Sequence, residues 1–252
     1  MRYNAAMKRL ACMLISLSVA LASPFLGEAR TQQEESELTA RYLPILLNVG
    51  RLVVERHQPL INDPEKSEKG FTSESFEREV VNEFFQQTGI DLKHLPPHLP
   101  APAKELLPIL LESGKHMVAD AQLVINQRGI GYKNFIPATF SSQTSRKFSS
   151  RSRVTLKQTT LNPRNPQNAP DAYEERVLKR LAAQPASHDP IAQWVDGGRT
   201  LRMMTPIYYS ADCLTCHGSP AGILDVSGYP REGAREGDLA GAISVKFPIS
   251  LP

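Results

Sequence analysis

Two cysteines and a histidine near the C-terminus are the residues of this chain best suited to chemistry. Cys213, Cys216 and His217 form the pattern C-x-x-C-H, which is the pattern for covalent attachment of c-type haem. Two thiols three positions apart can each add to a vinyl group on one porphyrin edge, and the adjoining imidazole can then ligate the iron. The motif predicts one haem c per chain, joined by thioethers to Cys213 and Cys216, with His217 as the proximal iron ligand.

The same cysteines could instead form a redox-active dithiol or belong to a zinc site. A thioredoxin-type pair should open a helix after an early strand. Here the pair is followed by His-Gly-Ser-Pro and a glycine-rich segment near the end of the chain. A structural zinc site usually needs four ligands at regular spacing, and the sequence has no second C-x-x-C pair. We favour haem and keep a periplasmic thiol-disulfide oxidoreductase as the alternative function.

The N-terminus has the three parts of a secretory signal. Arg2, Lys8 and Arg9 precede an uncharged run over residues 10–22, which ends in an Ala-Leu-Ala cleavage site. This run is shorter than the roughly 20 apolar residues that a membrane span needs, and an uncleaved anchor is the alternative. We therefore predict a signal peptide over residues 1–22, cleaved there or as late as Ala29. The mature protein should be periplasmic or otherwise exported, which suits c-type haem attachment.

Removal of the signal peptide changes the charge and cysteine totals. Lys and Arg fall from 29 to 26, which equals the 26 Asp and Glu residues, so the mature chain is near neutral. It lacks the basic character that nucleic-acid binding requires, and nucleic acid is not expected as a partner. Of three cysteines only the motif pair remains after Cys12 leaves. No second apolar run has membrane length, so we expect no stable membrane span after processing.

Periodicity predicts helices first and strands afterwards. Apolar residues at helical spacing and capping residues predict helices over 34–57, 73–89, 103–127 and 137–148, and one beginning at Pro170. Alternating patterns predict strands over 154–160, 191–195, 200–208 and 239–247. Gly197 and Gly198 are expected to form a hairpin turn between the second and third strands. This order predicts the α+β class.

Two further expectations concern side chains and connections within the helical part. The residues expected to face inward on the second and third helices are Phe76, Val80, Phe84, Phe85, Leu107, Leu110, Met117 and Val124. The proline-rich segment over 96–102 forms either a loop between helices or a domain boundary. We favour the loop.

Five long stretches carry a family resemblance. They are HQPLINDPEKSEKGF (57–71), NQRGIGYKNFIPATF (126–140), LKQTTLNPRNPQNAPDAYE (156–174), LRMMTPIYYSADCLTCHGSPAG (201–222) and GYPREGAREGDLAGAISVKFP (228–248). In these stretches the chain resembles the exported bacterial c-haem, PAS-like sensor domains. Such domains occur in front of histidine kinases and as stand-alone periplasmic haem proteins. The resemblance implies one domain over 30–252, with N-terminal helices packed on a PAS-like antiparallel sheet and haem held between them.

The resemblance leaves the sixth iron ligand open. In stand-alone members of the family a cysteine can serve as the second axial ligand, but the corresponding position here lies near Tyr132. The mature chain has no spare cysteine. The resemblance makes Tyr132 a candidate distal ligand, and Met203 is another because it lies on a predicted strand shortly before the motif. Met204, His57 and His116 are further possibilities. An open distal site is the interpretation that we favour.

Three arginines are candidates for binding the haem propionates, which are anionic and usually find a guanidinium or amide partner. Arg199 and Arg202 flank the start of the strand before the motif, and Arg164 lies in a proline-rich segment. Solvated arginines with no such role are the alternative at each position. Each of the three is therefore a separate candidate for a propionate partner.

These predictions together favour an exported c-type haem protein. It would act as a redox or diatomic-gas sensor or as a single-electron carrier, and we do not expect it to be an enzyme. Its partners would be haem and a separate membrane sensor kinase or redox protein, because the sequence leaves no room for an output domain.

Overall fold

The computed structural model describes residues 24–249. The predicted signal peptide over residues 1–22 lies outside this range. The elements are α1 (Pro24–Arg56), α2 (Gln58–Ile61), α3 (Ser73–Thr88), α4 (Ala101–Asp120), α5 (Gln122–Ile125), α6 (Pro137–Ser150), β1 (Thr155–Thr159), the 3₁₀ helix η1 (Pro166–Asn168), α7 (Ala172–Ala182), β2 (Ile191–Val195), the 3₁₀ helix η2 (Asp196–Gly198), β3 (Thr200–Tyr208), α8 (Leu214–His217) and β4 (Leu239–Pro248). Helices α1 to α6 precede the first strand of a four-stranded antiparallel sheet, and α7 and α8 lie between strands, which confirms the α+β prediction.

The sheet has the strand order β1-β4-β3-β2, and all neighbouring strands are antiparallel. Strands β2 and β3 form the predicted hairpin, in which Gly197 and Gly198 adopt φ angles of 67° and 85°. Glycine adopts such angles without the steric cost of a Cβ. Strand β4 pairs with β1 on one side and β3 on the other. The last strand of the chain therefore completes the middle of the sheet.

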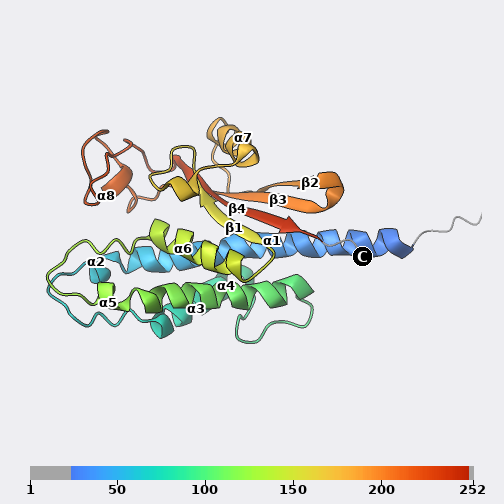
Figure 1. The fold of residues 1–252 in the computed structure, drawn as a ribbon, viewed down its shortest axis with the longest axis horizontal. Helices are drawn as coiled ribbons and strands as arrows, with labels where there is room; N and C mark the ends of the chain where they lie inside the picture. Colours follow the sequence, from blue (N-terminus) through green and yellow to red (C-terminus); the bar gives the residue numbers. More distant parts are fainter. Residues whose placement is uncertain (1–23, 250–252) are drawn as a thin grey trace, which may run out of the picture.

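Helices cover both faces of this sheet (Figure 1). Helices α1 and α6 pack on one face, α3 and α4 pack behind them, and α7 lies on the opposite face. Successive residues of a strand point to opposite faces. Met203 accordingly belongs to the large core with α1, whereas Met204 packs with Val177 and Leu181 of α7. The helices and the sheet thus share one main core, with a smaller one under α7.

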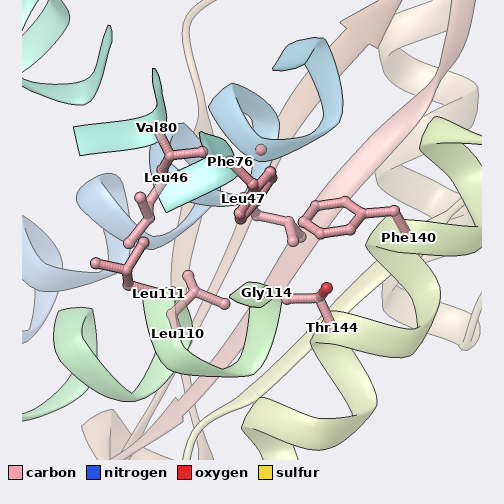
Figure 2. A pocket seen from close by; sticks show the side chains of 10 residues that line it. Leu46, Leu47, Phe76, Val80, Leu110, Leu111, Gly114, Phe140 and Thr144 are labelled. Atoms are coloured by element: carbon pink, nitrogen blue, oxygen red, sulfur yellow. The ribbon is translucent and has the colours of Figure 1, made fainter. Parts of the chain in front are cut away.

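Glycines allow α1 to approach α4 and α6 closely. A Cβ placed on Gly50 of α1 would lie 2.8 Å from Phe140 Cε1, and one on Gly114 of α4 would lie 3.3 Å from Phe140 Cζ and Phe76 Cε1. Figure 2 shows Phe76 and Phe140 within a small apolar cavity that these helices line. The two rings fill the space that larger residues at positions 50 and 114 would need.

Helix ends agree with the expected caps, but two inward-facing predictions are wrong. Thr72 caps α3 with a reciprocal capping box, and Gly89 ends it in the left-handed conformation. Phe85 is 50% exposed because it lies about 100° around the helix from the fully buried Phe84. Val124 is 45% exposed because α4, the third predicted helix, ends at Asp120. Val124 then lies on the separate short helix α5, where its side chain no longer continues the apolar face of α4.

The remaining inward-facing predictions hold to different degrees. Phe76, Val80, Phe84, Leu107 and Leu110 are buried, and Met117 is partly buried against the core. The proline-rich segment over 96–102 connects α3 to α4, two helices that contact each other. Within residues 24–249 no helix is long and apolar enough to cross a membrane.

Candidate functional site

The C-x-x-C-H motif lies in a long excursion over residues 209–238 between β3 and β4. Backbone hydrogen bonds close its base, because Gly237 N donates to Tyr209 O (2.9 Å) and Tyr209 N donates to Asp238 O (3.0 Å). Figure 1 shows this excursion, which we call the motif loop, at the same end of the molecule as α2 and α5. The sheet therefore holds both ends of the motif loop in fixed positions.

A single helical turn presents the motif. Cys213 is the N-cap of α8, and its carbonyl accepts a hydrogen bond from His217 N at 3.0 Å. Residues three apart on a helical turn lie on the same side, so the side chains of Cys213 and Cys216 are neighbours. Both are free thiols of intermediate exposure. The predicted attachment residues and the predicted iron ligand are thus brought together as the spacing requires.

His217 is oriented by a carboxylate from the returning part of the motif loop. Its Nδ1 lies 2.7 Å from Glu232 Oε2. The backbone supports this contact, because Ala234 N donates to His217 O at 2.8 Å. The ring also lies 4.9 Å from that of Tyr209, measured between centroids, with a tilt of 36°. With Nδ1 engaged, Nε2 is the ring nitrogen that remains for a ligand.

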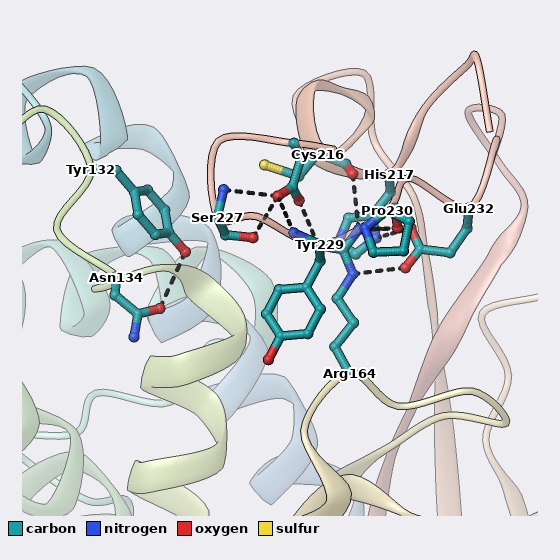
Figure 3. Close-up of polar contacts among 10 residues, drawn as sticks. Tyr132, Asn134, Arg164, Cys216, His217, Ser227, Tyr229, Pro230 and Glu232 are labelled. Atoms are coloured by element: carbon teal, nitrogen blue, oxygen red, sulfur yellow. Dashed lines mark hydrogen bonds and ion pairs between the residues drawn. The ribbon is translucent and has the colours of Figure 1, made fainter. Parts of the chain in front are cut away.

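Arg164 joins the proline-rich segment before α7 to the motif loop (Figure 3). Its Nη1 donates to Asp225 Oδ2 (2.6 Å), its Nε to Glu232 Oε1 (2.7 Å) and its Nη2 to Cys216 O (3.0 Å). The guanidinium is therefore neutralised by two carboxylates. In this structure Arg164 holds the motif loop in place, whereas the sequence predicted that its guanidinium would bind a haem propionate.

Asp225 is the buried end of this fastening. Its side chain is fully buried and also accepts from Ser227 N (2.8 Å), Ser227 Oγ (2.6 Å) and Tyr229 N (3.1 Å). Burial opposes its ionisation, but the bonds from Ser227 and Arg164 outweigh burial and hold the pKa of Asp225 well below its usual range. Asp225 is therefore charged at neutral pH and organises the turn after the motif.

A side chain of α1 reaches the first cysteine. Glu55 Oε1 accepts from Ser210 Oγ (3.0 Å) and lies 3.4 Å from Cys213 Sγ, which is 3.1 Å from Ser210 Oγ. Burial raises the pKa of the Cys213 thiol, and burial also raises the pKa of Cys216. Both thiols are therefore protonated at neutral pH, and the N-terminal helix contributes directly to the site.

Arg51 lies one helical turn before Glu55 on α1. Its Nη1 donates to Asn48 Oδ1 at 2.6 Å, and its buried Nε has no hydrogen-bond partner among residues 24–249. Burial lowers the pKa of Arg51, whereas Glu55 and Cys213 act in the opposite direction. The Arg51 guanidinium, hydrogen-bonded to Asn48 and near the carboxylate of Glu55, therefore lies close to the attachment motif.

Among the predicted distal ligands, Tyr132 lies beside the motif loop. Figure 3 shows its ring next to Ser227, and its hydroxyl donates to Asn134 Oδ1 at 3.2 Å. Burial raises the pKa of Tyr132, while a hydrogen bond with Ser227 lowers it. Tyr132 is therefore close to the motif, with its hydroxyl engaged by neighbouring polar groups.

The other distal candidates lie elsewhere. Met203 and Met204 are fully buried on opposite faces of the sheet. His57, the N-cap of α2, pairs through Nε2 with Glu79 Oε1 of α3 at 2.9 Å. His116 is exposed on α4. The structure thus places Met203 as a core residue, in agreement with the ordinary role of methionine on a strand.

Arg199 and Arg202 are not brought to the motif. Arg199 lies at the hairpin, where its Nε donates to Asp196 O at 2.9 Å. The motif follows the other end of β3, about 25 Å away at 3.3 Å per residue. Arg202 donates to Asp171 Oδ2 (2.7 Å) and stacks 4.5 Å from the Tyr173 ring centre, on the α7 face. Both arginines were predicted to bind the propionates because they lie close to the motif in sequence. This prediction is wrong in the structure, because the extended strand β3 separates them from the motif.

Exposed apolar side chains gather on the motif loop after the two cysteines. Ile223, Leu224, Val226 and Tyr229 are each about half exposed or more. The segment that carries them is ordered by backbone bonds from Gly222 N to Arg231 O and from Arg231 N to Ile223 O, both 2.9 Å. Large apolar groups on an ordered loop often mark a surface that another group covers.

The sequence analysis missed four residues of the site, namely Arg51, Glu55, Asp225 and Glu232. Asp225 and Glu232 lie within sixteen positions of His217, and a carboxylate that follows a candidate metal-ligating histidine is a signal that could have found them. Arg51 and Glu55 are distant in sequence and had no such signal.

The family model described as Tll0287-like matches residues 78–248, which is more than half of the chain. The chain belongs to the Tll0287-like family. This confirms the family resemblance seen in the sequence. The crystal structure of the cyanobacterial heme-protein Tll0287 is similar to this Tll0287-like chain over 46% of this chain and 73% of that one, with 21% identity and a TM-score of 0.39. No curated protein matches.

Proposed function

We propose that this Tll0287-like protein is an exported haem protein with one haem c per chain. Cys213 and Cys216 would form the thioethers, and His217 Nε2 would ligate the iron. The observation that carries the proposal is the arrangement on α8, where two unpaired thiols adjoin an imidazole whose Nδ1 is held by Glu232. A hydrogen bond at one ring nitrogen fixes the tautomer and directs the other toward a metal.

The side chains around α8 fit a porphyrin. Ile223, Leu224, Val226 and Tyr229 offer exposed apolar surface on the part of the motif loop that follows the thiols, which the hydrophobic face of a macrocycle would cover. Both thiols remain protonated and unpaired, so each is free to form a thioether. Bound haem supplies reversible one-electron chemistry and a site for diatomic ligands. The protein would contribute the axial ligand, the orientation of that ligand and apolar side chains that exclude water from the haem.

Arg51 is the better candidate for an anionic propionate than the three arginines predicted from the sequence. Its guanidinium keeps an unpartnered Nε, whereas Arg164 is neutralised by two carboxylates and Arg199 and Arg202 lie elsewhere. A buried cation gains most from an anionic partner that also satisfies its free donors. In the Arg51→Gln variant we expect weaker protection of the haem edge, seen as faster bleaching by peroxide. Equal bleaching rates would remove Arg51 from this role.

The proposed role is sensing of redox state or of a diatomic gas, or transfer of single electrons, without enzymatic turnover. An open distal site favours gas sensing, whereas ligation by Tyr132 favours a closed site. The partner would be a separate membrane sensor kinase or redox protein in the same exported compartment.

An absorption spectrum separates these roles. The processed protein, made in a host with c-type maturation, is recorded oxidised, reduced, and reduced under CO. We expect rapid CO binding by the reduced protein, with a sharpened and shifted Soret band. A reduced spectrum that CO leaves unchanged would contradict an open distal site and favour an electron carrier. Comparison with Tyr132→Phe then tests the tyrosine directly, because loss of a tyrosine ligand opens the site to CO.

The alternative, a thiol-disulfide oxidoreductase, is disfavoured by the thiols themselves. Reactive cysteines need a lowered pKa because the thiolate is the nucleophile, yet burial raises the pKa of both Cys213 and Cys216. A pyridine-haemochrome assay and an insulin-reduction assay on the same preparation decide between the two. A colourless protein that reduces insulin would support the alternative and contradict the haem proposal.

A further inference from the structure

Glu232 does more than touch His217, because its carboxylate is shared between an imidazole and a guanidinium. Glu232 Oε2 lies 2.7 Å from His217 Nδ1, a distance typical of a charge-assisted hydrogen bond. Arg164 Nε donates to Oε1 at 2.7 Å and Nη2 donates to Oε2 at 3.0 Å. The arginine thus grips both oxygens of the carboxylate that accepts from the imidazole.

The charge of Glu232 is secured by this arrangement. Its Oε1 lies 2.7 Å from Arg164 Nε and its Oε2 lies 3.0 Å from Arg164 Nη2, and this paired contact with a guanidinium favours the ionised carboxylate. Arg164 is in turn held by the fully buried Asp225 at 2.6 Å. Asp225, Arg164, Glu232 and His217 therefore form one chain of charged contacts that ends at the imidazole.

We propose that Glu232 is a positioning residue that sets the iron reduction potential through His217, and that Arg164 limits its effect. This inference rests on the proposed haem function. A carboxylate that accepts the Nδ1 proton leaves more negative charge on the ring and makes Nε2 a stronger donor. A stronger donor stabilises the ferric state and lowers the potential. Arg164 draws charge from the same carboxylate and so moderates that lowering.

The test compares reduction potentials of the haem-loaded protein and three variants. In Glu232→Gln the charge is lost at nearly constant shape, and we expect the ferric-ferrous equilibrium to shift roughly tenfold toward ferrous, a rise of about 59 mV. Arg164→Lys keeps the positive charge but loses the two-pronged grip on Glu232, so the potential should fall. Glu236→Gln removes an exposed carboxylate of the same loop and is the control for distant charge effects.

Resonance Raman spectra of the ferrous proteins give a second measurement. Damage to the motif loop alone would not shift the iron–histidine stretching frequency in opposite directions in the two variants. The iron–histidine stretching frequency should fall in Glu232→Gln and rise in Arg164→Lys. Unchanged frequencies and potentials in both variants would overturn the inference, as would an equal potential shift in Glu236→Gln. A wild-type protein without haem in the pyridine assay would instead overturn the proposed function.

Discussion

Asp225→Asn is the substitution that most sharply tests how the motif loop is held. Asparagine keeps one oxygen, which can still accept from Ser227 and Tyr229, but its amide faces Arg164 Nη1 with a donor in place of an acceptor. A hydrogen bond between charged groups contributes about 1.5–3 kcal/mol, and breaking a buried ion pair by removing one partner costs about 3–5 kcal/mol. Because Arg164 retains Glu232, we expect a loss of about 2–3 kcal/mol.

The assay must separate loop opening from global unfolding. Urea unfolding followed by fluorescence of the only tryptophan, Trp194 on β2, reports the sheet. Limited trypsin digestion at Arg231 and Arg235 reports the motif loop. We expect faster cleavage in Asp225→Asn, a larger effect in Asp225→Ala, which loses every accepted bond, and unchanged cleavage at Arg231 in the Glu236→Gln control. Wild-type cleavage rates together with an unchanged urea midpoint in Asp225→Asn would refute the role given to Asp225.

Three further predictions follow from the packing and charges. Gly50→Ala should lower the free energy of unfolding by about 1 kcal/mol, because crowding by the Phe140 ring exceeds the helix-propensity gain, whereas Gly114→Ala, with more space, should be nearly neutral; equal urea midpoints would contradict this difference. The pKa of Asp225 is lower in the folded than in the unfolded protein. The stability that its carboxylate contributes is therefore complete above the unfolded pKa of about 4 and is lost as the pH falls through the folded pKa. Limited digestion of the motif loop by an acid-active protease should show this loss in wild type and not in Asp225→Asn. His217→Ala should keep covalent haem but change the Soret band, and an unchanged spectrum would show that another residue ligates the iron.

Local features of this fold were predictable because their causes are local. The Gly197–Gly198 turn, the Thr72 cap and the Gly89 end of α3 each depend on the conformational preference of one or two residues. The contiguous Cys213, Cys216 and His217 are likewise presented together by one helical turn. Phe85 was misjudged because the buried face of α3 includes Phe84 but does not extend the roughly 100° around the helix to Phe85.

The surroundings of the motif depend on tertiary contacts that no local pattern encodes. Glu55 meets Cys213 only because α1 packs against the sheet beside the motif loop. Arg164 lies between β1 and α7, and it reaches Glu232 only because the later motif loop, between β3 and β4, folds back beside that segment. Arg199 and Arg202 were wrongly predicted to lie near the motif, because residues close to it in sequence can be far away in space when an extended strand separates them. Contacts set by topology therefore had to come from the structure.

The mass of the denatured, processed protein tests the haem assignment most directly. Wild type purified from a host with c-type maturation should carry the added mass of one haem, which survives denaturation because both thioethers are covalent. Replacement of Cys213 and Cys216 together by serine should abolish the addition. A wild-type mass equal to that of the bare polypeptide would contradict the account.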